Sequence, residues 1–90
     1  MPDEKLARAI KARTRRKILR LLIQNEKLSV QEISKKLNIT ESSASKHLKL
    51  LYDLGLVDFK EKFPEKFYSL KIKEIKDFFN VYNKIVKQLK

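Results

Sequence analysis

The sequence predicts a mainly helical domain with one small β-hairpin. Apolar residues recur at helical spacing along most of the chain, and the spacing changes to strict alternation only near residues 56–61. The single glycine, Gly55, stands where the spacing changes. Ninety residues suit one domain with a modest core, so we expect a single domain over residues 1–90.

The composition limits the classes of function. The chain has 22 basic and 11 acidic side chains and a formal charge of +11, which favours a polyanionic partner. It has no cysteine and one histidine, His47, so we expect no metal site. No apolar run approaches the roughly 18 residues of a membrane span, and the N-terminus is charged. We therefore expect a cytoplasmic protein without a membrane segment.

Catalytic patterns are missing from the sequence. It offers no nucleophile–base pair, phosphate-binding loop or carboxylate pair, so we expect neither an enzyme nor a bound cofactor. Abundant Lys and Glu together with the lack of Cys also resemble the composition of thermophile proteins.

The N-terminal segment predicts two helices. Pro2 and the two acids after it suit a first helical turn, and Leu6 and Ile10 give a thin apolar stripe. A broader apolar stripe runs from Ile18 to Ile23, and the second helix is expected to end at about Gln24. We place a bend near residues 12–14, with Thr14 as the cap of the second helix; one unbroken helix is the alternative, because no Gly or Pro forces a stop.

Basic charge is concentrated at the two ends of the chain. Residues 1–24 carry eight basic and two acidic side chains, residues 71–90 carry six and two, and residues 41–70 carry five of each. The arginines of the N-terminal segment have three possible roles: a solvated helix face, phosphate contacts, or pairing with acids. These arginines are Arg13, Arg15, Arg16 and Arg20.

The next segment predicts a short helix over Val30–Leu37. Val30, Ile33 and Leu37 share one face. Ser29 precedes this helix, and Glu32 follows three residues later, which is the spacing of a capping box.

A longer helix follows after two residues, Asn38 and Ile39. Thr40 is its expected cap, Glu41 suits the positive end of its dipole, and Gly55 closes it. Its apolar face holds Ala44, Leu48, Leu51 and Leu54, whereas its polar face holds Ser42, Ser43, Ser45, Lys46 and Lys49. Two such helices form a helix-turn-helix whose second helix can enter a major groove. An ordinary helical hairpin with a solvated polar face is the alternative.

A β-hairpin is predicted directly after this helix. Side chains alternate over residues 56–61, residues 62–65 form a turn around Pro64, and residues 67–70 form the return strand. The whole order is that of a winged helix-turn-helix. Lys60, Lys62 and Lys66 are expected near a minor groove or its phosphates, and we expect Phe63 to fold back on the hairpin.

The last segment, residues 72–90, predicts an amphipathic helix with a heptad-like apolar seam. The seam consists of Ile72, Ile75, Phe79, Tyr82, Val86 and Leu89, with Phe78 and Ile85 beside it. We expect it to pair with a second copy of the chain, together with Leu6 and Ile10 of the first helix, to form a homodimer. Packing against the first helix of the same chain is one alternative, and a membrane-surface helix is another.

Three stretches of the chain resemble the ArsR/SmtB family of winged-helix repressors. They are Ala12–Leu22 (ARTRRKILRLL), Leu28–Ile33 (LSVQEI) with Leu37, and Glu41–Leu51 (ESSASKHLKLL) with the Gly-Leu-Val of residues 55–57. The pattern Ser-x-His-Leu-Lys-x-Leu followed by Gly-Leu-Val is fairly specific, and residues 67–70 are similar to the family's second wing strand.

The resemblance implies a homodimer that binds a palindromic operator in double-stranded DNA and represses transcription, often until a metal ion releases it. Residue matching places the DNA-facing positions on the second hairpin helix, and the wing lysines complete the expected set. The expected DNA-binding residues are Thr40, Glu41, Ser42, Ser43, Ser45, Lys46, His47, Lys49, Lys60, Lys62 and Lys66.

The chain departs from the family at two places. Glu41 stands where glutamine is common; a carboxylate repels phosphate but can accept a hydrogen bond from cytosine N4. The family's metal sites use cysteines early in the hairpin or His and acids on the last helix. Ser29, Val30 and Gln31 occupy the first place here, and the last helix offers only Glu74 and Asp77.

Metal sensing of the family's kind is therefore not expected, and His47 is expected to be structural or DNA-facing. The rival function is a winged-helix protein-interaction module without specific DNA binding, because residues 41–70 carry no net charge.

Overall fold

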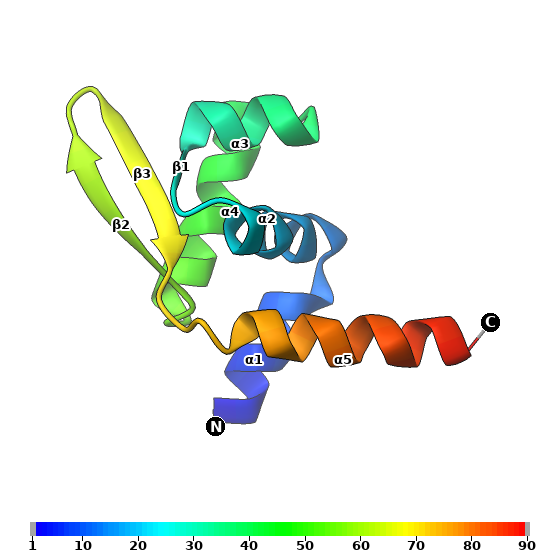
Figure 1. The fold of residues 1–90 in the computed structure, drawn as a ribbon. Coiled ribbons are helices and arrows are strands. Elements are labelled where there is room, and N and C mark those ends of the chain that lie inside the picture. The colour runs from blue at the N-terminus through cyan, green and yellow to red at the C-terminus, as the bar shows by residue number, and fades with distance from the viewer. Residues whose placement is uncertain (1, 90) are drawn as a thin grey trace.

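A computed structural model describes residues 2–89 and confirms the predicted fold class (Figure 1). Helices and a small antiparallel sheet follow one another in the order expected of a winged helix-turn-helix, with one added strand. The elements are α1 (Pro2–Lys11), α2 (Arg13–Gln24), β1 (Leu28–Ser29), α3 (Val30–Leu37), α4 (Glu41–Asp53), β2 (Val57–Lys62), β3 (Glu65–Leu70) and α5 (Ile75–Gln88).

The N-terminal segment forms two helices, as predicted, and the break is at Ala12. This residue is extended (φ −88°, ψ 132°) and is the N-cap of α2, which has no side-chain cap. The assignment of Thr14 as the cap was therefore wrong. Extended backbone at Ala12 ends the helical path two residues earlier, and Thr14 lies inside the first turn of α2.

Two arginines stabilise this break by binding the carbonyl end of α1. The Arg15 guanidinium donates to the Arg8 carbonyl from Nε (3.1 Å) and Nη2 (2.7 Å). The Arg16 guanidinium donates to the carbonyls of Ile10 and Lys11. The last carbonyls of a helix lack intrahelical partners, so these bonds satisfy α1 where it ends.

The helix-turn-helix has the caps that the sequence predicts. Ser29 Oγ accepts from the Glu32 backbone N–H (3.1 Å), and Glu32 Oε1 accepts from the Ser29 N–H (2.9 Å), which completes the capping box. Asn38 ends α3 in the left-handed region (φ 56°), and Thr40 Oγ1 caps α4. Gly55 follows α4 with φ +88°, a conformation that a residue with a side chain rarely adopts.

The sheet has three strands in the order β1-β3-β2, one more than the predicted hairpin. Leu28 pairs with Tyr68 and Ser29 with Phe67, so β3 is covered on both sides. Strand β1 was not predicted, because two residues are too few to show the alternation of apolar and polar side chains that indicates a strand.

The tip of the wing contradicts the expectation for Phe63, whose side chain is 94 % exposed. Folding back requires an apolar surface nearby. The last two pairs of the ladder are Glu61 with Lys66 and Lys62 with Glu65, and all four side chains are charged. The ring of Phe63 therefore has nothing apolar to cover.

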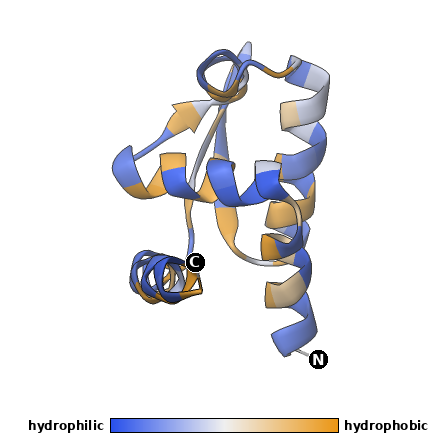
Figure 2. Ribbon diagram, turned by 90° about the vertical axis from the view of Figure 1, so that its right-hand side faces the viewer, coloured by the Kyte–Doolittle hydropathy of each residue, from blue (hydrophilic) through white to orange (hydrophobic). Residues whose placement is uncertain are grey.

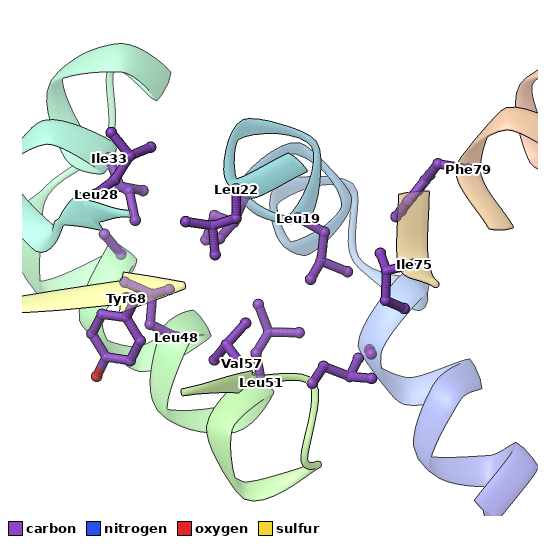
Figure 3. Close-up of a cluster of buried hydrophobic side chains, with 14 residues drawn as sticks. Leu19, Leu22, Leu28, Ile33, Leu48, Leu51, Val57, Tyr68, Ile75 and Phe79 are labelled. Carbon is purple, nitrogen blue, oxygen red and sulfur yellow. The ribbon is translucent and has the colours of Figure 1, made fainter. Parts of the chain in front are cut away.

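The core lies where α2, α4, the sheet and the start of α5 meet (Figure 3). Leu19, Leu48 and Leu51 are fully buried there, and Ile75 and Phe79 of α5 join them. The apolar seam of the last helix, which was predicted to pair with a second copy, is therefore divided. Its residues Ile75 and Phe79 belong to the core of the same chain.

Helix α5 starts at Ile75 rather than at residue 72. Residues 73–74 form a turn in which the N–H groups of Ile75 and Lys76 donate to the carbonyls three residues earlier. Within residues 2–89, no helix combines the length and apolar character needed to cross a bilayer.

The capping box predicts a stability effect. Ser29→Ala removes the acceptor for the Glu32 N–H in a buried position and should lower the free energy of unfolding by about 1 kcal/mol. Chemical denaturation measures this loss. Ser42→Ala, on the exposed face of α4, is the matched control and should change stability little; equal losses in both variants would contradict a role for the box.

Candidate nucleic-acid interface

Helix α4 presents one polar face to solvent because its other face is held in the core. Ala44, Leu48 and Leu51 are fully buried. Six of the predicted DNA-binding residues at this helix are exposed, whereas Ser43 and His47 are half-buried. The exposed residues are Thr40, Glu41, Ser42, Ser45, Lys46 and Lys49.

The start of α4 combines a capped backbone with short side chains. Thr40 Oγ1 accepts from the Ser43 N–H at 3.0 Å, so this hydroxyl already serves the helix. Glu41 and Ser42 follow in the first turn and are exposed. Short side chains at a helix N-terminus let the backbone approach a groove closely. In helix-turn-helix proteins the N-terminal residues of the second helix contact the base edges.

An open hollow of about 450 Å³ joins the start of α4 to the tip of the wing. Its lining residues come from β1, α3, α4, β3 and the turn of the wing: Ser29, Val30, Gln31, Glu41, Ser45, Pro64, Glu65 and Lys66. The start of α4, the first turn of α3 and the wing tip therefore form one continuous surface. Gln31 lines this hollow but was not among the predicted DNA-binding residues. Its position in the first turn of α3, two residues after the cap Ser29, could have indicated it.

The structure separates the three predicted wing lysines. Directly paired residues of an antiparallel ladder share a face. Lys66 pairs with Glu61 on the face of Phe59 and Tyr68, and its Nζ lies 4.9 Å from the Phe59 ring centroid. Lys60 and Lys62 lie on the opposite face, because they are one position out of phase with Phe59 and Glu61.

A second, larger groove of about 950 Å³ runs along this opposite face of the sheet. Lys60 and Lys62 line it together with Lys27, Lys73 and Lys76. It shares none of its lining residues with the hollow beside α4. Only Lys66 of the three wing lysines therefore lies on the same surface as the exposed face of α4.

His47 lies between the exposed face of α4 and the core. Burial lowers the pKa of His47 from its ordinary value of 6.5, and the nearby Arg15 charge lowers it further. The imidazole is therefore neutral at neutral pH and offers no positive charge to a phosphate. Of the two roles expected for His47, structural or DNA-facing, its neutral state favours the structural role.

The predicted dimer residues fall into two groups. Ile75 and Phe79 are buried within the chain, and Leu6, Ile10, Phe78 and Tyr82 are half-buried against the core. The second half of α5 is exposed: Ile85 by 52 %, Val86 by 40 % and Leu89 by 81 %. Figure 2, which views α5 nearly end-on, shows both hydrophobic and hydrophilic positions around this helix.

Arg20 of α2 makes contacts with three residues of α5. Its guanidinium carbon lies 5.0 Å from the Phe79 ring centroid and 6.0 Å from that of Tyr82. Its Nη2 donates to Asn83 Oδ1 at 3.1 Å. These contacts show that α5 packs on α2. They do not support the alternative in which α5 packs mainly on α1.

Comparison with known proteins gives consistent results for sequence and fold. Residues 13–58 match the family described as "Bacterial regulatory protein, arsR family". The chain is 34 % identical over 80 residues to the transcriptional activator HlyU of Vibrio cholerae, covering 89 % of this chain and 73 % of HlyU.

Solved structures extend the likeness to nearly the whole chain. A structure of HlyU from Vibrio cholerae N16961 superposes with a TM-score of 0.81 at 31 % identity, over 93 % of this chain and 90 % of that one. A homodimeric winged helix-turn-helix DNA-binding domain (fragment 1-100) from Mycobacterium bovis gives a TM-score of 0.84 at 21 % identity, over 97 % and 80 %. The second likeness concerns the fold alone.

The lowered pKa of His47 predicts a pH dependence of stability. A group whose pKa is lower in the folded state contributes stability above its unfolded pKa, and this contribution is lost as the pH falls. Wild type should therefore lose stability as the pH falls below about 6.5, the unperturbed value for histidine. His47→Gln should lose less over the same range, as measured by thermal melting; parallel losses in both proteins would contradict this assignment.

Proposed function

The chain belongs to the arsR family of bacterial regulatory proteins, and we propose that it regulates transcription as a homodimer on a palindromic DNA operator. A DNA-binding winged-helix regulator is the class that the family membership gives. The dimer, the operator symmetry, repression and the reading residues are the proposal. The observation that carries it is the exposed face of α4, where short hydroxyl side chains and lysines are held outward by a fully buried apolar face.

We assign the reading of DNA to the first half of α4. Glu41, Ser42 and Ser45 have the size and hydrogen-bonding groups to meet base edges, while Lys46 and Lys49 suit phosphates. Lys66 joins them from the wing. Arg15 and Arg16 are engaged with the carbonyls of α1, so fewer cations are free for phosphates than the formal charge suggests.

We assign dimerisation to the exposed second half of α5. Ile85, Val86 and Leu89 form an apolar surface next to the buried part of the same helix. A two-fold dimer would bury this surface against its copy and present two α4 helices, and such symmetry is mirrored in palindromic operators. The related fragment from Mycobacterium bovis is described as homodimeric, which supports the proposal.

Repression follows if the operator overlaps the sequences that start transcription. HlyU is named a transcriptional activator, so the similarity to HlyU does not fix the direction of control as repression. The position of the operator decides the direction of control. A reporter gene placed behind a selected operator tests it: expression should fall when the protein is supplied.

We propose that the signal that controls DNA binding by this protein is neither a metal ion of the kind that the family senses nor the oxidation of a thiol. The Ser29 hydroxyl is buried and engaged in the capping box, and Val30 and Gln31 are poor metal ligands. One HlyU structure is described as reduced, whereas these 90 residues contain no cysteine and carry no thiol switch.

The rival function is a protein-interaction module that does not bind DNA specifically. The neutral charge of residues 41–70 favours it. Selection from a random-sequence duplex pool separates the two, because a regulator enriches one symmetric sequence and an interaction module enriches none.

Substitutions on α4 test the reading of DNA. Glu41→Gln removes a carboxylate next to the phosphates and should raise affinity and change the preference at one base pair. Lys46→Ala and Lys49→Ala should weaken binding to all sequences and reduce the salt slope by about one per lost phosphate contact. Fluorescence anisotropy at several salt concentrations measures both effects; unchanged binding in all three variants would show that α4 is not the reader.

Substitutions on α5 test the dimer. Ile85→Asp places a charge on the exposed apolar surface without disturbing the core, whereas Phe79→Asp would also unfold the chain because Phe79 is buried. Ile85→Asp should therefore give a folded monomer by analytical ultracentrifugation and circular dichroism. Lys84→Glu, on an exposed polar position of the same helix, should remain dimeric. Wild type that is monomeric at micromolar concentration would refute the dimer.

A further inference from the structure

The wing tip combines an exposed aromatic ring with charges that cancel. Phe63 is 94 % exposed, although burial of such a ring is favourable. The four charged residues behind it are two lysines and two glutamates in directly opposed pairs. The tip therefore attracts a polyanion only weakly through net charge, and its contribution to binding must come from shape and apolar contact.

The two lysines at the tip point to opposite faces of the hairpin. Lys62 lies on the face away from α4, and Lys66 lies on the face toward it. Phe63 lies between them at the apex. A minor groove has the matching arrangement: two phosphate strands at its edges and apolar sugar faces along its walls, about 6 Å apart. One lysine can then face each phosphate strand while the ring enters the groove.

The tip is also placed beside the surface that reads DNA. Pro64, Glu65 and Lys66 line the same hollow as Glu41 and Ser45 of α4. If α4 lies in a major groove, a projection next to its N-terminal half meets the flanking DNA.

We propose that Phe63 inserts into the minor groove beside the recognition site and packs against its sugars and base edges. This inference rests on the proposed DNA binding. Apolar side chains such as Phe enter minor grooves of other DNA-binding proteins, and flexible pyrimidine–purine steps accept them most easily. Phe63 thereby adds affinity and a preference for deformable flanking steps that α4 does not contact.

A single-tryptophan reporter tests the contact. The chain has no tryptophan, so Phe63→Trp gives one emitter at the tip. With a duplex selected from a random-sequence pool by the wild-type protein, its emission should shift to shorter wavelength and become protected from acrylamide quenching. Tyr52→Trp is the control, because Tyr52 is an exposed aromatic on the other half of α4, and its emission should stay unchanged.

Affinity provides the second measurement. Phe63→Ala should weaken binding roughly tenfold, the scale expected for loss of one aromatic contact to nucleic acid. Phe63→Leu, which keeps an apolar wedge, should retain most of the affinity. Neither substitution should change the melting temperature of the free protein, because the ring contacts nothing that stabilises it.

The outcomes separate this inference from the proposed function. Wild-type binding to the duplex, with a fully quenchable indole in the Phe63→Trp complex and unchanged affinity of Phe63→Ala, overturns the role of Phe63 and leaves the function of α4 intact. Failure of the wild-type protein to bind any duplex overturns both. A loss of affinity in Phe63→Ala together with a protected indole in Phe63→Trp supports the insertion.

Discussion

Burial of α2 between α4, the sheet and α5 is the interaction on which the other elements depend. Its residues Ile18, Leu19 and Leu22 are almost fully inaccessible, and they meet the apolar face of α4 on one side and the start of α5 on another. Burying each such side chain is worth roughly 1.5–3 kcal/mol before ordering costs. The outward face of α4 is defined only because this packing fixes its inward face.

The polar side of α2 stabilises the two outer helices. Arg15 and Arg16 bind the carbonyl end of α1, and Arg20 binds Asn83 and covers Phe79 of α5. A guanidinium carries several donors in one plane, which suits it to carbonyls and aromatic faces alike. Three of the five arginines therefore serve the fold, and the total charge of +11 overstates the charge available to DNA.

Local signals made most of the helical part predictable. Ser29, Glu32 and Thr40 identify helix starts by the hydrogen bonds that their side chains make within a few residues, and Gly55 marks an end in the same way. Features that depend on pairing between strands were missed. The strand at Leu28–Ser29 exists only because β3 lies beside it, and the exposure of Phe63 follows from the two charged pairs that the ladder places behind the tip.

The candidate site shows the same difference. Spacing within α4 predicted which of its side chains face outward, since a helix fixes that geometry by itself. It did not predict the separation of Lys66 from Lys60 and Lys62, which depends on the register of the ladder. Nor did it identify the hydrogen bond from Arg20 to Asn83, which joins residues 63 positions apart in the chain.

Helix α5 connects folding with assembly. Its first half, with Ile75 and Phe79, is part of the core, while the half that carries Ile85 and Leu89 projects away from the wing (Figure 1). We therefore expect each chain to fold without the partner, so that association in the proposed dimer is a separate step that depends on concentration. In the proposed dimer, the two α4 helices bind one operator with high affinity only after that step, so the amount of protein in the cell would itself set the occupancy of the operator.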